Sequence, residues 1–360
     1  MAKNKPPADA APEATPGWDA IDAALEKIYG KAEPLHYASV VKWMMGGPDP
    51  LDGVSVYKRD LPSPHWHFVS YGLTELYVKE SDDAELSGFG FELTFRLARD
   101  AKAQQPPMWA VAFMQNLARY IFESGNTFAP GHHLNANGPI AQGDPTELRA
   151  VLFASDPELP EIETPHGSMQ FVQIVGITLD ELEAVQTWNS AGFTALLADH
   201  FPLLVTDLKR KSFLLDAATA KTVHEQTKKE GSSTGEIYVG EWTWRKRSHG
   251  TRIVMGAQSA QLWLVQLRGR LAHGRPLVVL GAGDKPENAT MFVPGGKNEI
   301  SLDEDGALLI SLTAEAALAL IASVQPTRGI YKPTILQDFQ IEVVPTSIKN
   351  QKGEVVKVVG

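Results

Sequence analysis

The chain has 360 residues, of which 43% are hydrophobic and 21% are charged, an ordinary globular composition with enough length for two domains. It contains no cysteine, which excludes disulfides, a thiol nucleophile and thiolate sites for zinc or iron–sulfur clusters. The formal net charge of −10 disfavours direct binding to the phosphates of nucleic acids.

The N-terminal residues and the hydropathy of the chain bear on its location. Met1 to Pro16 are rich in Ala, Pro and Lys and lack the apolar core of a signal peptide, so a disordered tail is predicted over 1–16. No run of about 18 apolar residues occurs, so no membrane span is predicted. Because a chain without cysteine fits a reducing compartment, we expect a cytoplasmic protein.

The elements of the first 130 residues follow from the spacing of apolar side chains. Apolar residues from Trp18 to Ile28 recur at steps of three and four and predict a helix over 17–29. The other elements expected here are a turn-rich loop over 46–53, strands over 64–70 and 88–97, and a helix that begins after Pro107.

The strand over 88–97 has the clearest pattern. Its apolar residues from Phe89 to Leu97 alternate with Gly90, Glu92, Thr94 and Arg96, a period of two residues. One face of this strand should therefore pack against a core, while the other face should be polar.

The chain from 169 to 256 predicts the end of the first domain. Residues 169–177 are nearly all apolar and predict a buried strand, after which Thr178 and Glu181 have capping-box spacing for a helix. Further expectations are a helix or turn over 191–200, strands over 202–207 and 236–244, and a polar region over 221–233 that ends in a flexible stretch. The basic, glycine-containing segment 245–256 is interpreted as an interdomain linker.

The rest of the chain is rich in predicted strands. They are expected over 262–271, 276–281, 307–312 and 339–344, with one helix over 313–323. Strands mixed with helices, without regular βαβ alternation, predict an α+β fold made of two mixed α/β domains. We assign an N-terminal domain to 17–244, a smaller β-rich domain to 257–346, and a C-terminal tail to 347–360.

Histidines offer an alternative function, a metal-dependent hydrolase. His65 and His67 lie two residues apart on one predicted strand, His132 and His133 follow in a loop, and imidazole suits zinc or iron. However, the chain has no HExxH and no nucleotide-binding glycine motif. The favoured interpretation is a binding protein without catalytic residues, metal or other cofactor.

Several sequence blocks occur together, in this order, in one known family. They are VVKWMMGGPDPLDGVSVYK (40–58), HWHFVSYGLTELY (65–77), SGFGFELTFRL (87–97), MQNLARYIFESGNTF (114–128), FVQIVGITLDELEAVQTWN (171–189), LVTDLKR (204–210) and LVQLRGRLAHGRP (264–276). Through these blocks the chain resembles the Suppressor of fused family over about 18–345. Its short second part, without a long insertion, is similar to bacterial-type members.

The resemblance implies a two-domain protein that binds another protein. In animals the family protein sequesters the zinc-finger transcription factors of Hedgehog signalling in the cytoplasm. A short peptide from the factor lies in a cleft between the domains and pairs with strand edges, a mode known as β-augmentation. Bacterial members are proposed immunity proteins that neutralise a toxin domain, and an acidic surface would suit a basic nuclease. A regulator and an immunity protein both stay open.

The resemblance also implies partner-binding residues. Tyr120 and Phe128 match peptide contacts of the family, while His132 stands where the family has an acidic residue, so a different ligand is expected. In the second domain, Leu267 and Arg268 are expected on the matching strand.

The loop over 46–53 and the block that follows it supply three further candidates. Asp49, Asp52 and Trp66 are predicted to be functionally important. For the two aspartates the structural alternative is turn formation, because Asp in a loop of Pro and Gly commonly accepts hydrogen bonds from backbone amides.

Overall fold

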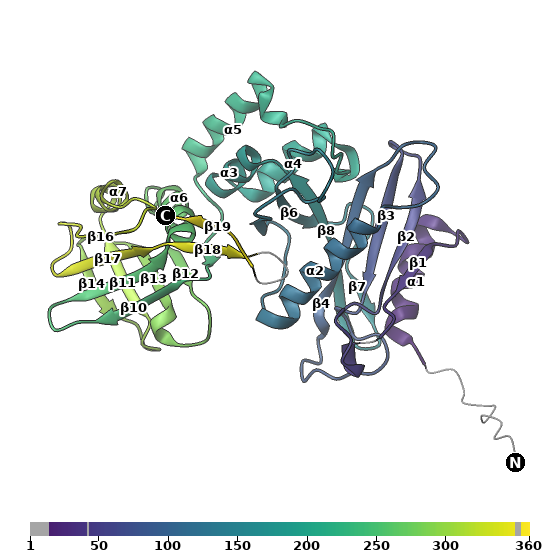
Figure 1. Cartoon of the computed structure of the whole chain (residues 1–360), viewed down its shortest axis with the longest axis horizontal. Helices are drawn as coiled ribbons and strands as arrows, with labels where there is room; N and C mark the ends of the chain where they lie inside the picture. Colours follow the sequence, from purple (N-terminus) through teal and green to yellow (C-terminus); the bar gives the residue numbers. More distant parts are fainter. Residues whose placement is uncertain (1–13, 42, 350–353) are drawn as a thin grey trace, which may run out of the picture. The chain divides into compact units, whose positions relative to one another are not determined.

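The structure, a computed structural model, describes residues 14–41, 43–349 and 354–360. The chain divides into two compact units (Figure 1). Unit 1 comprises the described residues up to Leu182 together with Thr194–Ser212, and unit 2 comprises Glu183–Phe193 and Phe213–Gly360. The chain therefore crosses between the units after residues 182, 193 and 212.

A mixed sheet of eight strands forms the centre of unit 1 (Figure 1). Its order is β1-β2-β3-β4-β8-β6-β5, and β7 pairs with β8. The strands are β1 (Leu35–Ala38), β2 (Gly53–Arg59), β3 (His65–Tyr71), β4 (Leu86–Ala98), β5 (His133–Asn135), β6 (Ala150–Ser155), β7 (Ile162–Thr164) and β8 (Gly167–Ile177). The pairs run antiparallel except β4 and β8, which run parallel.

Helix α2 (Met108–Ser124) covers one face of this sheet. It starts after Pro107 and ends at Gly125, whose left-handed φ of 74° lets its N–H donate to the carbonyl of Ile121 at 2.8 Å. The apolar row of β4 packs with this helix in one core. Its central members are Phe91, Leu93, Phe95, Leu97, Met114, Leu117 and Ile121.

Helix α1 (Pro16–Tyr29) packs on the opposite face through Ile21 and Leu25. That face also carries Glu92, Thr94 and Arg96 of β4, all fully buried. The alternation predicted for this strand is therefore confirmed, but its polar row lies inside the protein and not in solvent.

Unit 2 contains two larger sheets and a C-terminal hairpin. One sheet has the order β10-β11-β17-β16 and the other β14-β15-β13-β12-β9, while β18 pairs with β19. The strands are β9 (Glu236–Tyr238), β10 (Trp242–Lys246), β11 (Thr251–Gly256), β12 (Leu277–Leu280), β13 (Ala289–Pro294), β14 (Glu299–Leu302), β15 (Leu308–Leu312), β16 (Gly329–Tyr331), β17 (Phe339–Val344), β18 (Thr346–Lys349) and β19 (Val355–Val359).

Helices α6 (Ala257–Leu271) and α7 (Ala314–Ser323) pack with these sheets around Trp242, Trp263 and Phe292. Thr313 caps α7 by accepting from the N–H of Ala316 at 3.2 Å. The other helical elements are α3 (Leu179–Thr187), α4 (Ser190–His200), α5 (Ala217–Glu230) and the 3-10 turns η1 (Trp43–Met45), η2 (Pro202–Leu204), η3 (Phe213–Leu215) and η4 (Pro286–Asn288).

The strand predicted over 262–271 is wrong, because these residues belong to helix α6. Ala260, Trp263, Leu267 and Leu271 are buried and recur every three or four residues, which is helical spacing. The segment is hydrophobic as predicted, but its apolar residues have the period of a helix and not that of a strand.

Two further segments differ from the prediction. The polar region 221–233, for which no helix was predicted, lies in helix α5 as far as Glu230, and Asp216 caps this helix by accepting from the N–H of Thr219 at 2.8 Å. The strand expected over 202–207 is broken by turn η2, because Leu203 and Leu204 have φ values of 56° and 53°.

The predicted domain boundary also needs correction. Segment 245–256 is not a linker, since it holds the end of β10 and all of β11, and Ile253 and Met255 are buried in the core of unit 2. The compact units meet along the chain at 182, 193 and 212 instead. The C-terminal tail predicted from 347 contains strands β18 and β19. The predicted N-terminal tail lies almost wholly outside the described residues, and helix α1 already starts at Pro16.

Among the described residues, no helix is long and apolar enough to cross a membrane.

Candidate interaction surface

The loop before β2 is held against helix α2 by its backbone. The N–H of Leu51 donates to Oε1 of Gln115 at 3.1 Å, and Nε2 of Gln115 donates back to the Leu51 carbonyl at 3.1 Å. Leu51 itself is fully buried in the core beneath α2. One amide side chain therefore satisfies both polar groups of a buried backbone position, which fixes the loop on the helix.

The two candidate aspartates of this loop bind groups of unit 1. Asp49 accepts from Nη1 of Arg119 on α2 at 2.5 Å. Asp52 accepts from the hydroxyl of Tyr77 at 2.6 Å, and its N–H donates to the carbonyl of Tyr71 at 2.8 Å. Both carboxylates thus fasten the loop, but through side-chain donors and not through the backbone amides that the structural alternative expected.

Trp66 is not a loop residue. It lies in β3 and is 2% exposed, inside the core shared with α2. The guanidinium of Arg99 lies over its ring at 5.4 Å, a cation–π contact. Its position makes Trp66 a core residue that no partner can reach.

Tyr120 and Phe128 are brought together at one edge of α2. Their rings stack with centroids 5.7 Å apart, and Phe128 stacks in turn on Phe153 of β6 at 4.0 Å. Tyr120 is 42% exposed, whereas Phe128 is only 7% exposed. The ring of Tyr120 is therefore partly exposed, while Phe128 supports it from below.

His132 and strand β5 lie next to this aromatic stack. His132 is exposed, and its carbonyl accepts from the N–H of Phe153, the residue that supports the stack, at 2.8 Å. β5 is the last strand of the sheet and pairs with β6 through one edge only. Among the described residues no strand occupies its other edge.

A second group of apolar side chains surrounds the 3-10 turn η1. Trp43 is 38% exposed and meets Phe122 of α2 edge-on at 5.5 Å, and Phe122 meets Phe89 of β4 at 5.1 Å. Val41 and Met45 are exposed beside Trp43. The sequence carried no local signal for this group, because its members come together from three distant elements.

A buried network of charges lies on the α1 face of the sheet. Arg96 binds both oxygens of Asp156 at 2.6 and 3.0 Å, and Asp156 lies 3.3 Å from Nε2 of His67. Tyr29 of α1 donates its hydroxyl to Nδ1 of His67 at 2.6 Å, and Arg96 also reaches Glu158 at 3.0 Å. The row of polar residues in β4 is visible in the sequence, but no local pattern indicates that it takes part in this network.

Electrostatics in this network favour a neutral imidazole. Burial, together with the nearby Arg96 guanidinium, lowers the pKa of His67 to about 4. Burial raises the pKa of Asp156, but the contacts to His67 and Arg96 outweigh it and hold that pKa well below its usual value. A neutral histidine between a tyrosine hydroxyl and a carboxylate is fully enclosed here, so the network stabilises the fold.

The histidines predicted for a metal site do not form one. His65 and His67 are buried in β3, and His132 and His133 lie at β5, with β4, β8 and β6 between the two strands. Four strand spacings of about 4.8 Å separate the two pairs by roughly 19 Å. No group of three His, Cys, Asp or Glu side chains in the described parts of the chain could hold a metal ion. The structure therefore gives the hydrolase alternative no support.

The predicted contacts of the second domain differ from expectation. Leu267 and Arg268 lie on helix α6, not on a strand. Leu267 is fully buried in the core of unit 2, whereas Arg268 is exposed. Only Arg268 of this pair could contact a partner directly.

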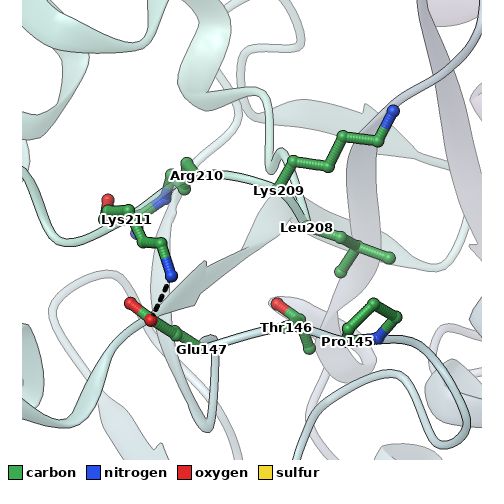
Figure 2. Close-up of a pocket in the computed structure, with 7 residues that line it drawn as sticks. All are labelled: Pro145, Thr146, Glu147, Leu208, Lys209, Arg210 and Lys211. Carbon is green, nitrogen blue, oxygen red and sulfur yellow. Dashed lines mark hydrogen bonds and ion pairs between the residues drawn. The ribbon is translucent and has the colours of Figure 1, made fainter.

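A cavity of about 300 Å³ lies in unit 1, apart from all residues predicted for the site. Figure 2 shows its lining, which consists of Pro145, Thr146, Glu147, Leu208, Lys209, Arg210 and Lys211. Lys211 forms an ion pair with Glu147, while the Lys209 side chain points away from that pair. Arg210 is bound to both oxygens of Glu181 at 2.6 Å. Because two of its three cations are already paired, the cavity has no charge pattern that would define a ligand.

Known proteins share both the sequence and the fold. The family model for Suppressor of fused protein matches residues 47–211. The human Suppressor of fused homolog is 38% identical over 239 residues, which are 61% of this chain and 49% of that protein, and the mouse homolog is 37% identical over the same shares. The chain thus spans about half the length of the curated relatives it matches.

Two solved structures extend the comparison. The crystal structure of Drosophila Suppressor of Fused is 23% identical and aligns with a TM-score of 0.72 over 91% of this chain and 97% of that chain, so the two-domain mixed α/β fold is shared. A chain of the Sufu–Fu complex is 33% identical, with a TM-score of 0.53 over 58% of this chain and 97% of that chain. The family model, the human and mouse homologs and these structures agree: the chain belongs to the Suppressor of fused family.

Proposed function

We propose that this chain is a non-enzymatic binding protein that captures an extended segment of a protein partner by adding it to strand β5. The observation that carries the proposal is a sheet edge at β5 that lies beside the exposed ring of Tyr120. Backbone hydrogen bonds at the edge would supply affinity, and the ring would select a side chain of the partner.

Some backbone groups of β5 bind β6, and the others could bind a partner. The carbonyl of His132 and the N–H of Ala136 are used toward β6, at 2.8 and 2.9 Å. Because backbone groups alternate along an antiparallel strand, those of His133 and Asn135 point to the opposite edge. An added strand would pair with these two residues.

The comparisons support a protein as the partner. One of the matching solved structures is a Sufu–Fu complex, in which a family member is bound to another protein. Contributions from Arg268 and from the expected cleft between the two domains stay predictions from the resemblance, as does a cytoplasmic location.

Charge suggests the class of partner. The net charge of −10 would favour a basic protein, since opposite potentials speed association and add specificity. His132 replaces the acidic residue expected at this position from the resemblance, so a ligand other than the animal peptide is proposed. An immunity role, in which the chain binds a basic toxin domain, fits these features, and a regulator remains the alternative.

Peptide selection tests the binding surface directly. Random extended peptides would be displayed on phage and selected on the purified chain, and the dissociation constants of the selected peptides would be measured by fluorescence anisotropy. Tyr120→Ala should weaken binding by about ten-fold or more, as expected for loss of an aromatic anchor. Asn135→Pro should do the same, because it removes an outward N–H while the bonds to β6 stay in place.

The matched control is Met108→Ala, which truncates an exposed side chain at the other end of α2 and should leave binding unchanged. Thermal unfolding would confirm that all three variants are folded. If Tyr120→Ala and Asn135→Pro bind selected peptides as well as the parent chain does, this edge is not the binding site.

A further inference from the structure

We propose that Arg270 and Arg275 form a second binding site, in unit 2, for an oxyanion such as a phosphate or a carboxylate group. Nη1 of Arg270 and Nη1 of Arg275 both donate to the carbonyl of Ser232, at 2.8 and 3.1 Å. Two guanidinium groups therefore converge on one neutral oxygen.

Most donors of this arginine pair remain available. A guanidinium has five N–H groups in a fixed planar fork. Arg270 uses Nε, which donates to the Pro276 carbonyl at 2.9 Å, and Nη1. Among the described residues, Nη2 of Arg270 and both Nε and Nη2 of Arg275 have no hydrogen-bond partner. These groups can bind two oxygens of one anion side by side.

The charge of the pair is not compensated. No ion pair between described residues involves Arg270 or Arg275, although the chain as a whole is strongly acidic. Other arginines contrast with this, because Arg59, Arg96 and Arg119 each contact a carboxylate. Burial and the neighbouring Arg275 lower the pKa of Arg270, which shows that positive charge is crowded here.

A purely structural role explains only part of this arrangement. Arg270 lies in the last turn of α6, where a cation is favourable and its contact to Pro276 fastens the chain that follows. The Ser232 carbonyl has two lone pairs and can accept from both arginines, but it is neutral and does not compensate their charge. A second half-buried cation adds like-charge repulsion that no described carboxylate relieves, whereas a bound anion would relieve it.

The backbone beside the pair carries a glycine next to the Arg270 guanidinium. Ser232 lies in the segment 231–235, of sequence GSSTG. A Cβ added to Gly235 would come within 3.3 Å of Nη2 of Arg270, so glycine avoids a close contact with this guanidinium. Both arginines are half-buried, and their planar guanidinium forks suit a single oxyanion better than an extended polyanion.

Side-chain NMR of arginine tests the proposal with the full chain. Inorganic phosphate would be titrated into protein labelled with ¹⁵N at arginine, against sodium chloride at equal ionic strength. The Nε–H signals of Arg270 and Arg275 should shift to saturation with phosphate and not with chloride, while that of Arg268 stays unchanged. Shifts of all three signals together, or none, would overturn the proposal.

Variants and peptides separate the pair from general charge and identify the source of the anion. Arg275→Gln should weaken phosphate binding by about ten-fold, as loss of a charge-assisted contact predicts, whereas Arg268→Gln, the same charge change on an exposed residue of α6, should not. Equal effects of the two variants would reject the site. Short peptides with one phosphoserine, one glutamate or one serine then show whether phosphate or carboxylate is preferred, and equal binding of all three would also reject it.

This site does not rest on the proposed capture of a partner at β5. Its probes are small anions and its variants lie in unit 2, so failure of the β5 experiment leaves it intact, and its own failure leaves β5 intact.

Discussion

Arg96 and Asp156 show how much a single buried side chain contributes to unit 1. Both are enclosed, and Arg96 is the sole cation that contacts Asp156 with two donors in the described network. Removing one partner of such a pair leaves an uncompensated charge inside the protein, which is far more unfavourable than losing an exposed pair.

Replacing Arg96 should therefore destabilise the protein strongly. Arg96→Met is expected to lower the free energy of unfolding by about 3–5 kcal/mol, measured by urea denaturation. Arg59→Met is the matched control, because Arg59 also binds Glu158 but is partly exposed, and it should cost about 1 kcal/mol. Similar losses for the two variants would show that the enclosed pair has no special role.

His67 gives unit 1 a defined dependence on pH. Its pKa is about 4 in the folded state against 6.5 as the ordinary value, so between these pH values the unfolded chain binds the proton and the folded chain does not. The stability contribution is thus complete above pH 6.5 and is lost as the pH falls toward 4. Asp156, whose pKa is lowered, loses its contribution only below its usual value of 3.8.

The variant His67→Gln isolates this effect. Denaturation curves between pH 4 and 7 should show a loss of stability on acidification that is smaller in the variant by up to about 3 kcal/mol. A parallel loss in variant and parent would mean that His67 does not titrate in this range.

At the residue scale, the sequence identified positions better than roles. Tyr120 and Arg268 are exposed as a binding role requires, but Phe128, Trp66 and Leu267 are buried, because an aromatic or leucine side chain looks the same in a core and at an interface. The sequence predicted that one face of β4 is polar, but nothing local reveals that α1 covers this face.

At the scale of elements, regular local patterns were predicted well and ambiguous ones were not. β4 and α2 have clear periods, β8 is a nearly continuous apolar run, and all three lie where the sequence placed them. In α6 the run of Leu, Trp and Val suits a buried strand and a buried helix equally, and only packing of Leu267 and Leu271 against the sheets decides.

Helix α6 carries a glycine in its interior for a packing reason. A Cβ on Gly269 would lie 2.9 Å from Cβ of Ser232, whose N–H donates to the Gly269 carbonyl at 2.8 Å. Gly269→Ala should therefore destabilise the protein by about 1–2 kcal/mol, because the clash exceeds the gain of about 1 kcal/mol in helix propensity. Gly240→Ala, which meets no atom within 4 Å, should be neutral in the same thermal unfolding assay.

At the scale of the whole molecule, the prediction of two mixed α/β domains is correct, but the predicted boundary between them is in the wrong place. Composition suggested a linker at the basic segment 245–256, yet basic and glycine residues also suit an exposed hairpin such as β10 and β11. The division is harder to see because residues 183–193 belong to unit 2 while 194–212 return to unit 1. Sequence patterns report neighbours along the chain, whereas units are defined by contacts across it.

Truncation distinguishes the two divisions. A fragment that ends at Ser212 keeps the whole of unit 1 and should unfold cooperatively. A fragment that ends at Trp244 adds β9 and part of β10 without β12 and β11, their partners, so limited proteolysis should trim it back toward 212. Protection of residues 213–244 in the longer fragment would contradict this division.

The parallel pairing of β4 with β8 has a consequence during synthesis. β4 ends at Ala98 and β8 begins at Gly167, so the ribosome adds nearly 70 residues before β4 finds its central neighbour, on the order of ten seconds at usual translation rates. Throughout this interval the edge of β4 that pairs with β8 stays open, even after α2 has been synthesised and can cover the phenylalanines. The nascent chain should therefore depend on holding chaperones, and faster translation should decrease its aggregation by shortening the exposure.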